Sequence, residues 1–238
     1  MTMAYSAQAL VEQADATSGG TIALTGLTIG RGLTVTFFLH SAGSTPSALA
    51  ATFNGTDVLT VIDSPSYNST SSWAIQMAYF PAVTAASGNL VYTFSGTDNP
   101  NEISYAIVKE IYDTVAGGID VDASGSGTGS STDPTFNIAT TASSNLIIGG
   151  LSSNAALTVG SGYTDNGSIT WYIGEWSQYQ IYSSSGTKTF NFTGLTSQWA
   201  GAATAFKAAA AGGPSVAQTW PAMVGATNNA VMIGRRFI

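Results

Sequence analysis

The stretch SSWAIQMAYFPAVTAASGNLVYTFSGTDNPNEISYAIVKEI, from Ser71 to Ile111, decides the fold that this sequence predicts. A second stretch, EWSQYQIYSSSGTKTFNFTGLTSQWAGAATAFKA from Glu175 to Ala208, follows the same plan. Each has a tryptophan near its start, alternating residues up to a tyrosine, a Ser-Gly turn, a strand ending in Phe-Ser/Thr-Gly, and a last apolar strand. The matching residues are Trp73 and Trp176, Tyr79 and Tyr182, and Phe94 and Phe192. We therefore predict a strand–turn–strand–loop–strand unit that occurs twice, each copy needing the other to cover its apolar face.

The chain of 238 residues carries few charges. Charged residues make up 8% of it, against roughly 25% in ordinary soluble domains, while 44% of its residues are hydrophobic. The net charge is −7 at pH 7, and the sequence pI is about 4.3. Binding to nucleic acid or to an anionic membrane surface needs clustered Lys and Arg, and the one adjacent basic pair is Arg235-Arg236. The composition therefore predicts neither nucleic-acid binding nor membrane binding.

Three features that the sequence lacks indicate the cellular compartment that we expect for the protein. The chain has no cysteine, which excludes a disulfide framework and a thiolate metal site. No apolar run is long enough to span a bilayer. The first residues, MTMAYSAQALVEQADATSGG, lack the basic and apolar regions of a signal peptide. We expect a protein that is kept in the cytosol or assembled there into something larger.

Alternating apolar and threonine residues predict further strands over Thr21 to Ile29 and Leu33 to Leu39. Asn54-Gly55 lies between two apolar runs and predicts a tight hairpin, because both residues tolerate positive φ. Asp165-Asn166-Gly167 predicts a second hairpin turn by the same reasoning. The segment from Ala7 to Val11 fits a strand or a helical turn, and we favour the strand.

Two later segments interrupt the pattern of strands. The small-residue run ASGSGTGSST, from Ala123 to Thr132, predicts a flexible surface loop, with a domain linker as the alternative. Beyond the Gly-Gly-Pro break at residues 212–214, an apolar arm follows. Such an arm must bury itself on its own sandwich or on a neighbouring molecule, and the sequence leaves both open.

Few residues offer catalytic or metal-binding chemistry. His40 is the only histidine, and no G-x-S-x-G or S-x-x-K pattern marks a nucleophilic serine. Asp120 and Asp122 lie two residues apart, near Asp113, so they share a strand face and could ligate Ca²⁺ through oxygens. We favour the alternative that they are solvated acids at a strand edge. We predict no enzyme activity, no cofactor and no metal.

Glu175 lies among aromatic residues, which resembles a sugar-binding or glycosidase cleft. The aromatic residues are Trp171, Tyr172, Trp176, Tyr179 and Tyr182. Glycoside cleavage normally takes two carboxylates, and the one other acid nearby is Asp165. Strand alternation sends Trp176 and Tyr182 to one face and Tyr179 to the other. We therefore favour a core role, with glycan contact by Trp171, Trp176 and Tyr179 as the alternative.

The order of these blocks resembles a widespread type of β-sandwich protein that is encoded among the structural genes of tailed bacteriophages. The blocks are QALVEQADATSGGTIALTGLTIGRGLTV, ATFNGTDVLTVI, SWAIQMAYF with SGNLVYTFSG, and ASGSGTGSST with NIATTASSNLIIGG. The resemblance covers about Ala7 to Lys207, and each block by itself is generic strand-and-turn chemistry. It implies a virion component without catalytic residues, either a head decoration (cement) protein or a tail-associated or fibre domain.

We therefore predict an all-β protein with a single antiparallel two-sheet β-sandwich of jelly-roll type over residues 1–208 and an extended C-terminal arm over residues 209–238. Two intertwined copies, at about 20–111 and 118–208, are expected to form the two sheets jointly. The resemblance implies a capsid decoration protein in the virion, assembled in the bacterial host cytoplasm. It would bind the major capsid protein or other virion proteins and form a homo-oligomer such as a trimer, with a tail fibre or a receptor- or carbohydrate-binding module as the alternative. The arm residues expected to make protein contacts are Trp220, Met223, Val224, Val231, Met232, Ile233, Phe237 and Ile238.

Overall fold

The computed structural model describes residues 3–5, 19–40, 48–69, 73–95, 103–113, 118–130, 132–169, 174–194 and 198–208. These residues form an all-β fold of antiparallel strands, as the sequence predicted. The first half of the chain contains β1 (Met3–Tyr5), β2 (Gly19–Thr25), β3 (Gly32–His40), β4 (Ala48–Phe53), β5 (Asp57–Val58), β6 (Thr60–Asn68), β7 (Trp73–Phe80), β8 (Ser87–Ser95) and β9 (Ile103–Asp113). The second half contains β10 (Ile119–Gly129), β11 (Thr135–Thr140), β12 (Asn145–Ser153), β13 (Thr158–Val159), β14 (Thr164–Ile169), β15 (Gly174–Tyr182), β16 (Gly186–Thr193) and β17 (Trp199–Ala208).

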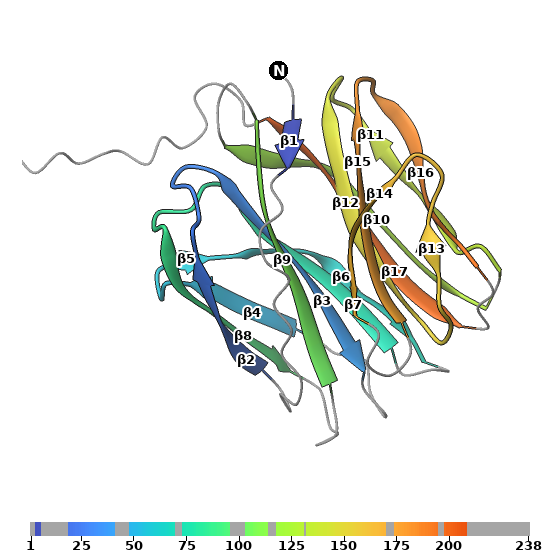
Figure 1. Ribbon diagram of the computed structural model, residues 1–238, viewed down its shortest axis with the longest axis horizontal. Coiled ribbons are helices and arrows are strands. Elements are labelled where there is room, and N and C mark those ends of the chain that lie inside the picture. Colours follow the sequence, from blue (N-terminus) through green and yellow to red (C-terminus); the bar gives the residue numbers. More distant parts are fainter. Residues whose placement is uncertain are drawn as a thin grey trace, which may run out of the picture.

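The described strands form four sheets stacked as four layers (Figure 1). An outer sheet of order β2-β8-β4-β5 packs on an inner sheet of order β1-β9-β3-β7-β6. A second inner sheet, β10-β17-β12-β15-β14, packs on the first one and is covered in turn by the outer sheet β11-β16-β13. The chain therefore builds two sandwiches that meet through their five-stranded sheets.

The expectation of two sheets formed jointly by both copies was wrong, because every sheet takes its strands from one half of the chain. In the first half β9 pairs with β3, and β3 pairs with β7. In the second half β17 pairs with β12, and β12 pairs with β15. The alternation of apolar residues is the same whether a strand pairs within its own copy or with the other. Pairing within a copy closes shorter loops, which costs less conformational entropy.

Each half has its own apolar core between its outer and inner sheets. In the first half Phe37 of β3 packs against Tyr92 and Phe94 of β8, with ring centroids 4.8 Å and 5.5 Å away. In the second half Phe190 of β16 packs against Tyr163 with a ring separation of 5.1 Å. These aromatic contacts lie on the inward faces that strand alternation predicts.

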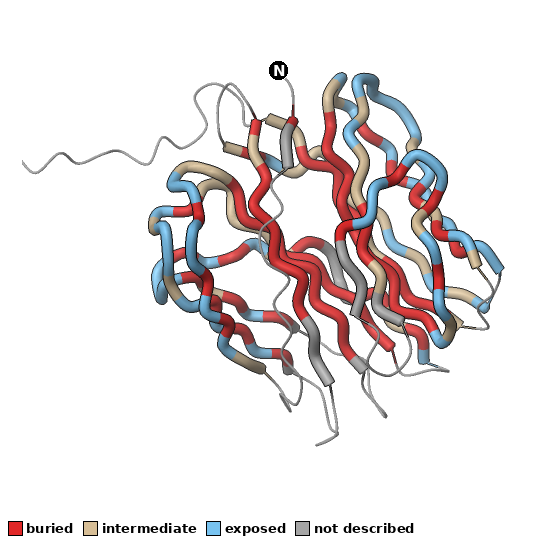
Figure 2. Tube along the Cα trace, viewed as in Figure 1, coloured by how far each residue is buried: buried red, intermediate tan, exposed pale blue. Residues whose placement is uncertain are grey.

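The two five-stranded sheets meet through a further apolar layer. Figure 2 shows that buried residues run along the strands of both sheets. Alternate residues of β7, Ile75 and Met77, face the second half, and Phe206 of β17 faces the first half. The buried residues of this layer are Met3, Phe38, Ile62, Ile75, Met77, Ile107, Ile111, Ile119, Leu146, Ile148, Ala200 and Phe206. Each half therefore covers an apolar sheet face of the other.

The two halves share one strand order, but the tryptophans that suggested the repeat are not equivalent. Strands β1-β9-β3-β7-β6 correspond in order to β10-β17-β12-β15-β14. Because Ala74 and Ala78 face the first core, alternation puts Trp73 on the opposite side of β7, toward the second half. Trp176 packs against the core of its own sandwich. Trp73 and Trp176 therefore face opposite sides of their strands, and aligning the two copies by their tryptophans puts them one residue out of structural register.

The glycine-rich segment predicted as a flexible loop is instead strand β10, and that prediction was wrong. β10 pairs with β17 from Ile119↔Ala208 to Gly129↔Trp199. The missing side chains are needed for close packing, because a Cβ on Gly125 would lie 2.6 Å from the carbonyl oxygen of Asn137. A Cβ on Gly127 would lie 3.0 Å from the ring of Trp199. Glycine marks a close approach of neighbouring strands here rather than a loop.

The two Asn-Gly dipeptides adopt different structures. Asn54 and Gly55 have φ of 54° and 74° and connect β4 to β5, which confirms the predicted hairpin. Asp165-Asn166-Gly167 is not a turn, since it lies inside β14 at a shift of register between Asp165 and Gly167. Asn166 is the extra residue of a β-bulge. Glycine is common at bulges as well as at turns, so the Asn-Gly pair by itself does not distinguish the two.

Candidate functional site

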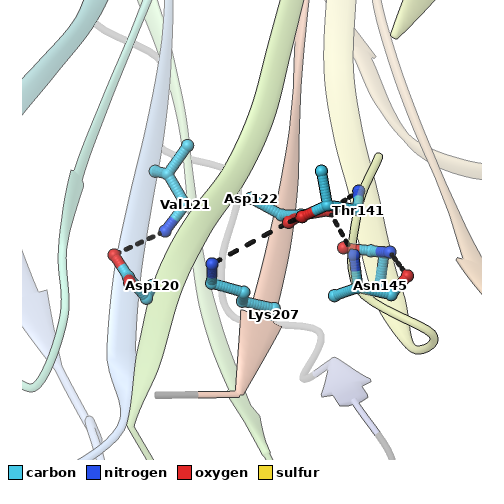
Figure 3. Close-up of polar contacts among 7 residues, drawn as sticks. Asp120, Val121, Asp122, Thr141, Asn145 and Lys207 are labelled. Carbon is cyan, nitrogen blue, oxygen red and sulfur yellow. Dashed lines mark hydrogen bonds and ion pairs between the residues drawn. The ribbon is translucent and has the colours of Figure 1, made fainter. Parts of the chain in front are cut away.

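The acidic residues at the start of β10 are the first candidate site (Figure 3). Asp122 is the extra residue of a bulge between Val121 and Ala123. Its carboxylate accepts hydrogen bonds from the backbone N of Thr141 at 2.8 Å, from the backbone N of Ala142 at 3.1 Å, and from the hydroxyl of Thr141. Nζ of Lys207 lies 3.8 Å from Oδ1 of Asp122. These contacts tie β10 to the connection between β11 and β12.

Asp120 and Asp122 do not converge on a shared cation position. The bulge breaks the alternation that would place both carboxylates on one face. The Asp120 carboxylate accepts a hydrogen bond from the backbone N of Val121 at 2.9 Å, away from Asp122 (Figure 3). Burial raises the pKa of Tyr79, and the charge and hydrogen bond of Asp120 raise it further, so Asp120 also faces the junction of the two halves. The prediction that the two acids share a strand face was therefore wrong.

The net pKa of Asp122 is lowered from its usual value by its surroundings. Burial alone raises this pKa, because it penalises the charged form. The hydrogen bonds from Thr141 and Ala142 and the charge of Lys207 outweigh that effect by stabilising the carboxylate. Asp122 is thus a structural anion that is satisfied by backbone donors, and its side chain is fully enclosed.

Two further buried acids hold turns in the first half. Glu110 accepts a hydrogen bond from the backbone N of Thr28 at 2.7 Å and lies 3.3 Å from Nη1 of Arg31. Asp57 accepts hydrogen bonds from the backbone N of Thr84 at 3.3 Å and from its hydroxyl at 2.7 Å. Both carboxylates are occupied in bracing connections between the two sheets of one sandwich.

The aromatic residues considered for glycan contact lie on different sides of β15. Trp176 is half-buried against the core of the second sandwich, whereas Tyr179 packs into the layer between the two halves. Tyr182 lies on the Trp176 side, and its hydroxyl donates to the hydroxyl of Tyr163 at 3.2 Å. The predicted alternation is confirmed, and Trp176 and Tyr179 do not form one common surface.

Other predicted site residues lie outside the described part of the structure. They are Trp171 and the arm residues Trp220, Met223, Val224, Val231, Met232, Ile233, Phe237 and Ile238. The backbones of His40 and Glu175 belong to β3 and β15, but their side chains are not among the described ones. Within the described ranges, no three His, Cys, Asp or Glu side chains gather closely enough to hold a metal ion.

Hydrogen bonds between the two halves were missed by the sequence analysis. Oγ of Ser66 donates to the carbonyl oxygen of Gly127 at 2.9 Å. Nδ2 of Asn68 donates to the carbonyl oxygens of Gly129 at 3.2 Å and Trp199 at 3.1 Å. These contacts join β6 to β10 and β17, and no local pattern signals them, because the partners are 61 or more residues apart.

A groove of about 250 Å³ lies beside the end of β17, where residues 209–238 begin. Its lining consists of Met3, Ala142, Ser143, Ser144, Lys207 and Ala208. Its one charged lining group is Lys207, which already faces Asp122. The groove offers hydroxyl groups and small apolar surface rather than an acid–base pair.

The outward faces of both outer sheets carry no charge at their described positions. On β2-β8-β4-β5 a cross-strand row runs through Val58, Thr52, Val91 and Thr21. The outward positions of this sheet are Thr21, Ala23, Thr25, Ala50, Thr52, Val58, Ser87, Asn89, Val91 and Thr93. Those of β11-β16-β13 are Thr135, Asn137, Ala139, Thr158, Thr187, Thr189, Asn191 and Thr193. We call these surfaces the outer faces.

Comparison with known proteins identifies no relative of this chain. No protein-family model, curated protein or solved structure matches the chain. In the part of the chain that the structure describes, no helix is long and apolar enough to cross a membrane.

Proposed function

We propose that this chain is a non-enzymatic structural protein of a bacteriophage particle, a capsid decoration or cement protein that binds the capsid surface and stabilises it. The sequence resemblance points to the particle, and the outer faces carry the structural part of the proposal. They lie on the two outermost layers of the stack, and their outward side chains are hydroxyl, amide, methyl or isopropyl groups. A strongly acidic protein meets less repulsion from acidic neighbours across surfaces without charge.

The jelly-roll assignment belongs to this proposal, and the strand order supports it. In the first half the chain alternates between layers: β1 and β3 lie in the inner sheet, and β2 and β4 lie in the outer one. β8 then returns between β2 and β4, and β9 returns between β1 and β3. The second half repeats this order, with β16 between β11 and β13 and β17 between β10 and β12. Two jelly rolls in tandem therefore explain both halves with one winding rule.

The use of the buried acids supports a non-enzymatic role. Asp57, Glu110 and Asp122 each accept hydrogen bonds from backbone N–H groups. A carboxylate engaged in this way accepts charge-assisted hydrogen bonds and braces a turn. Catalytic acids are instead tuned toward proton exchange within a cleft.

The residues beyond Ala208 are assigned to particle contacts in this proposal. All acidic residues of the chain precede position 209, while residues 209–238 contain Arg235 and Arg236 and no acid. Opposite charge on the body and the arm favours contact of the arm with an acidic neighbour, such as a second copy or the major capsid protein. The sequence resemblance adds to this proposal a homo-oligomer such as a trimer, located in the virion after assembly in the host cytoplasm.

The test is reconstitution on isolated particles. The full chain should bind capsids that lack it and raise the temperature at which they release their genome. A chain ending at Gly212 should keep its thermal unfolding transition but lose particle binding. Normal binding by the truncated chain would remove the arm from the proposal, and no binding by the full chain to heads would contradict the capsid role.

A tail fibre or receptor- or carbohydrate-binding module is the alternative, and the outer faces favour it by another argument. Their Thr and Asn side chains offer hydrogen-bond donors and acceptors without charge, which suits neutral sugars. Binding to tails rather than heads, together with binding to a glycan array that Thr189→Lys abolishes, would support this alternative over the first.

A further inference from the structure

The chain contains two Asn-Gly pairs in its described part, Asn54-Gly55 and Asn166-Gly167. Asparagine followed by glycine is the dipeptide most prone to spontaneous loss of the side-chain amide. Glycine has no Cβ, so its backbone N can approach the preceding side chain without steric hindrance. By sequence alone the two pairs are equally reactive.

The Asn54 pair is open to water and to the reaction. Asn54 and Gly55 are both exposed in the hairpin between β4 and β5. A Cβ built on Gly55 meets no atom within 4 Å, so the turn is open on that side, while the Asn54 side chain lies against Gly88 of β8. The N of Thr56 donates to the carbonyl oxygen of Phe53 at 3.3 Å, and the N of Asn54 donates to the carbonyl oxygen of Asn89 in β8 at 2.9 Å. The Asn54 side chain has to move off Gly88 to reorient, which is a smaller opening than the loss of strand pairing.

The Asn166 pair is held in β14, the edge strand of the second inner sheet. Asn166 is 4% exposed, and its Nδ2 donates to the hydroxyl of Ser177 at 2.7 Å. That hydroxyl donates in turn to the carbonyl oxygen of Gly149 at 2.8 Å. Strand pairing of β14 with β15 flanks the bulge on both sides. The amide of Asn166 is therefore shielded from water, and its hydrogen bond to Ser177 fixes its orientation.

We propose that Asn54 is a site of spontaneous covalent modification in the folded protein and that the fold protects Asn166. The backbone N of Gly55 forms a bond to Cγ of Asn54, and the amide nitrogen leaves as ammonia after proton transfer from solvent. Water then opens the five-membered succinimide at one of its two carbonyl carbons. The product is either aspartate or isoaspartate at position 54, and no oxidant or cofactor takes part.

The modification changes the hairpin between β4 and β5, at the edge of the outer sheet. Each product places a negative charge three residues before Asp57 in the chain, whose carboxylate accepts hydrogen bonds from the backbone N and hydroxyl of Thr84. Isoaspartate also adds one carbon to the main chain of the turn, which disturbs the pairing of Thr52 with Val58. The tip of this hairpin therefore gains a charge as the protein ages. This inference does not depend on the proposed function.

The test is peptide mass spectrometry on the folded full chain during incubation in mildly alkaline buffer. We expect deamidated and isoaspartate forms of the Asn54 peptide to accumulate, and those of the Asn166 peptide to form at least about tenfold more slowly, because its reaction requires local opening. The same chain in concentrated urea should modify both sites at similar rates. Asn54→Gln should abolish the signal at position 54 and leave position 166 unchanged.

Two results would overturn the proposal. The first is an Asn54 peptide that stays as unmodified as the Asn166 peptide in the folded protein. The second is equal, rapid modification of both sites without denaturant, which would show that the sheet gives Asn166 no protection.

Discussion

Nδ2 of Asn68 lies 3.1 Å from the carbonyl oxygen of Trp199, joining the edge strand of one sandwich to the inner sheet of the other. The same amide donates to the carbonyl oxygen of Gly129 at 3.2 Å, and the Asn68 side chain is buried. We expect Asn68→Ala to lower the free energy of unfolding by about 1–3 kcal/mol, because two carbonyl groups lose their donor. Urea denaturation measures this change. Asn137→Ala, on an outer face, should stay within about 0.5 kcal/mol of the parent, and equal effects of the two variants would contradict the role of Asn68.

Gly125→Ala should destabilise the protein because the added methyl group has no room. Its Cβ would lie 2.6 Å from the carbonyl oxygen of Asn137, a backbone atom that cannot rotate away. Overpacking of this kind costs about 1–3 kcal/mol. Thermal unfolding should show a lower midpoint than for Ser126→Ala, an exposed change in the same strand. An unchanged midpoint for Gly125→Ala would show that β10 does not approach β11 so closely.

Asp122 should make stability depend on pH in the acid range. Its pKa in the folded protein lies below the unfolded value of 3.8, so the unfolded chain binds the proton more readily. The stabilisation is therefore fully present above the unfolded pKa and is lost as the pH falls through the folded pKa. Asp122→Asn should lower the free energy of unfolding by about 1–3 kcal/mol at neutral pH, since one acceptor oxygen is replaced by a donor facing backbone N–H groups.

The measurement for Asp122 is a series of urea denaturation curves for parent and variant across this pH range. The difference between the two chains should shrink toward low pH. A difference that is independent of pH would show that packing, rather than charge, accounts for the effect of the substitution.

Trp176 provides a test that separates a core role from glycan contact. Trp176→Ala should cost about 2 kcal/mol or more, because a half-buried ring leaves the core of the second sandwich. Trp176→Phe should cost less than that, because Nε1 of Trp176 is buried without an acceptor and its removal relieves an unpaired donor. Calorimetry measures both changes. Unchanged stability of Trp176→Ala together with lost glycan binding would favour the carbohydrate interpretation.

Local patterns predicted strands well where alternation was strong, and they failed where pairing partners decide the structure. The alternation through Leu33, Val35 and Phe37 correctly indicated a strand with one face in a core. It could not indicate whether that strand pairs with its own copy or the other one, because both choices bury the same residues. The number of sheets and their assignment to halves therefore emerged only from the register of the pairs.

Two of the predictions that were based on glycine and asparagine are ones that the structure contradicts. A glycine-rich run has the composition of a loop, yet Gly125 and Gly127 are required where Asn137 and Trp199 approach β10. Asn166-Gly167 has the composition of a turn, yet it forms a bulge that binds Ser177. In both cases the local preference is permissive, and tertiary contacts select one of several structures that it allows.

The layer between the five-stranded sheets makes the two sandwiches interdependent. If one half unfolds, the other keeps its own core but exposes residues such as Leu146, Ile148 and Phe206 to water. An apolar sheet face that is exposed in this way promotes association, and it can pack against the same face of another partly unfolded molecule. Proteolytic loss of either half should thus lead to precipitation rather than to a soluble remnant.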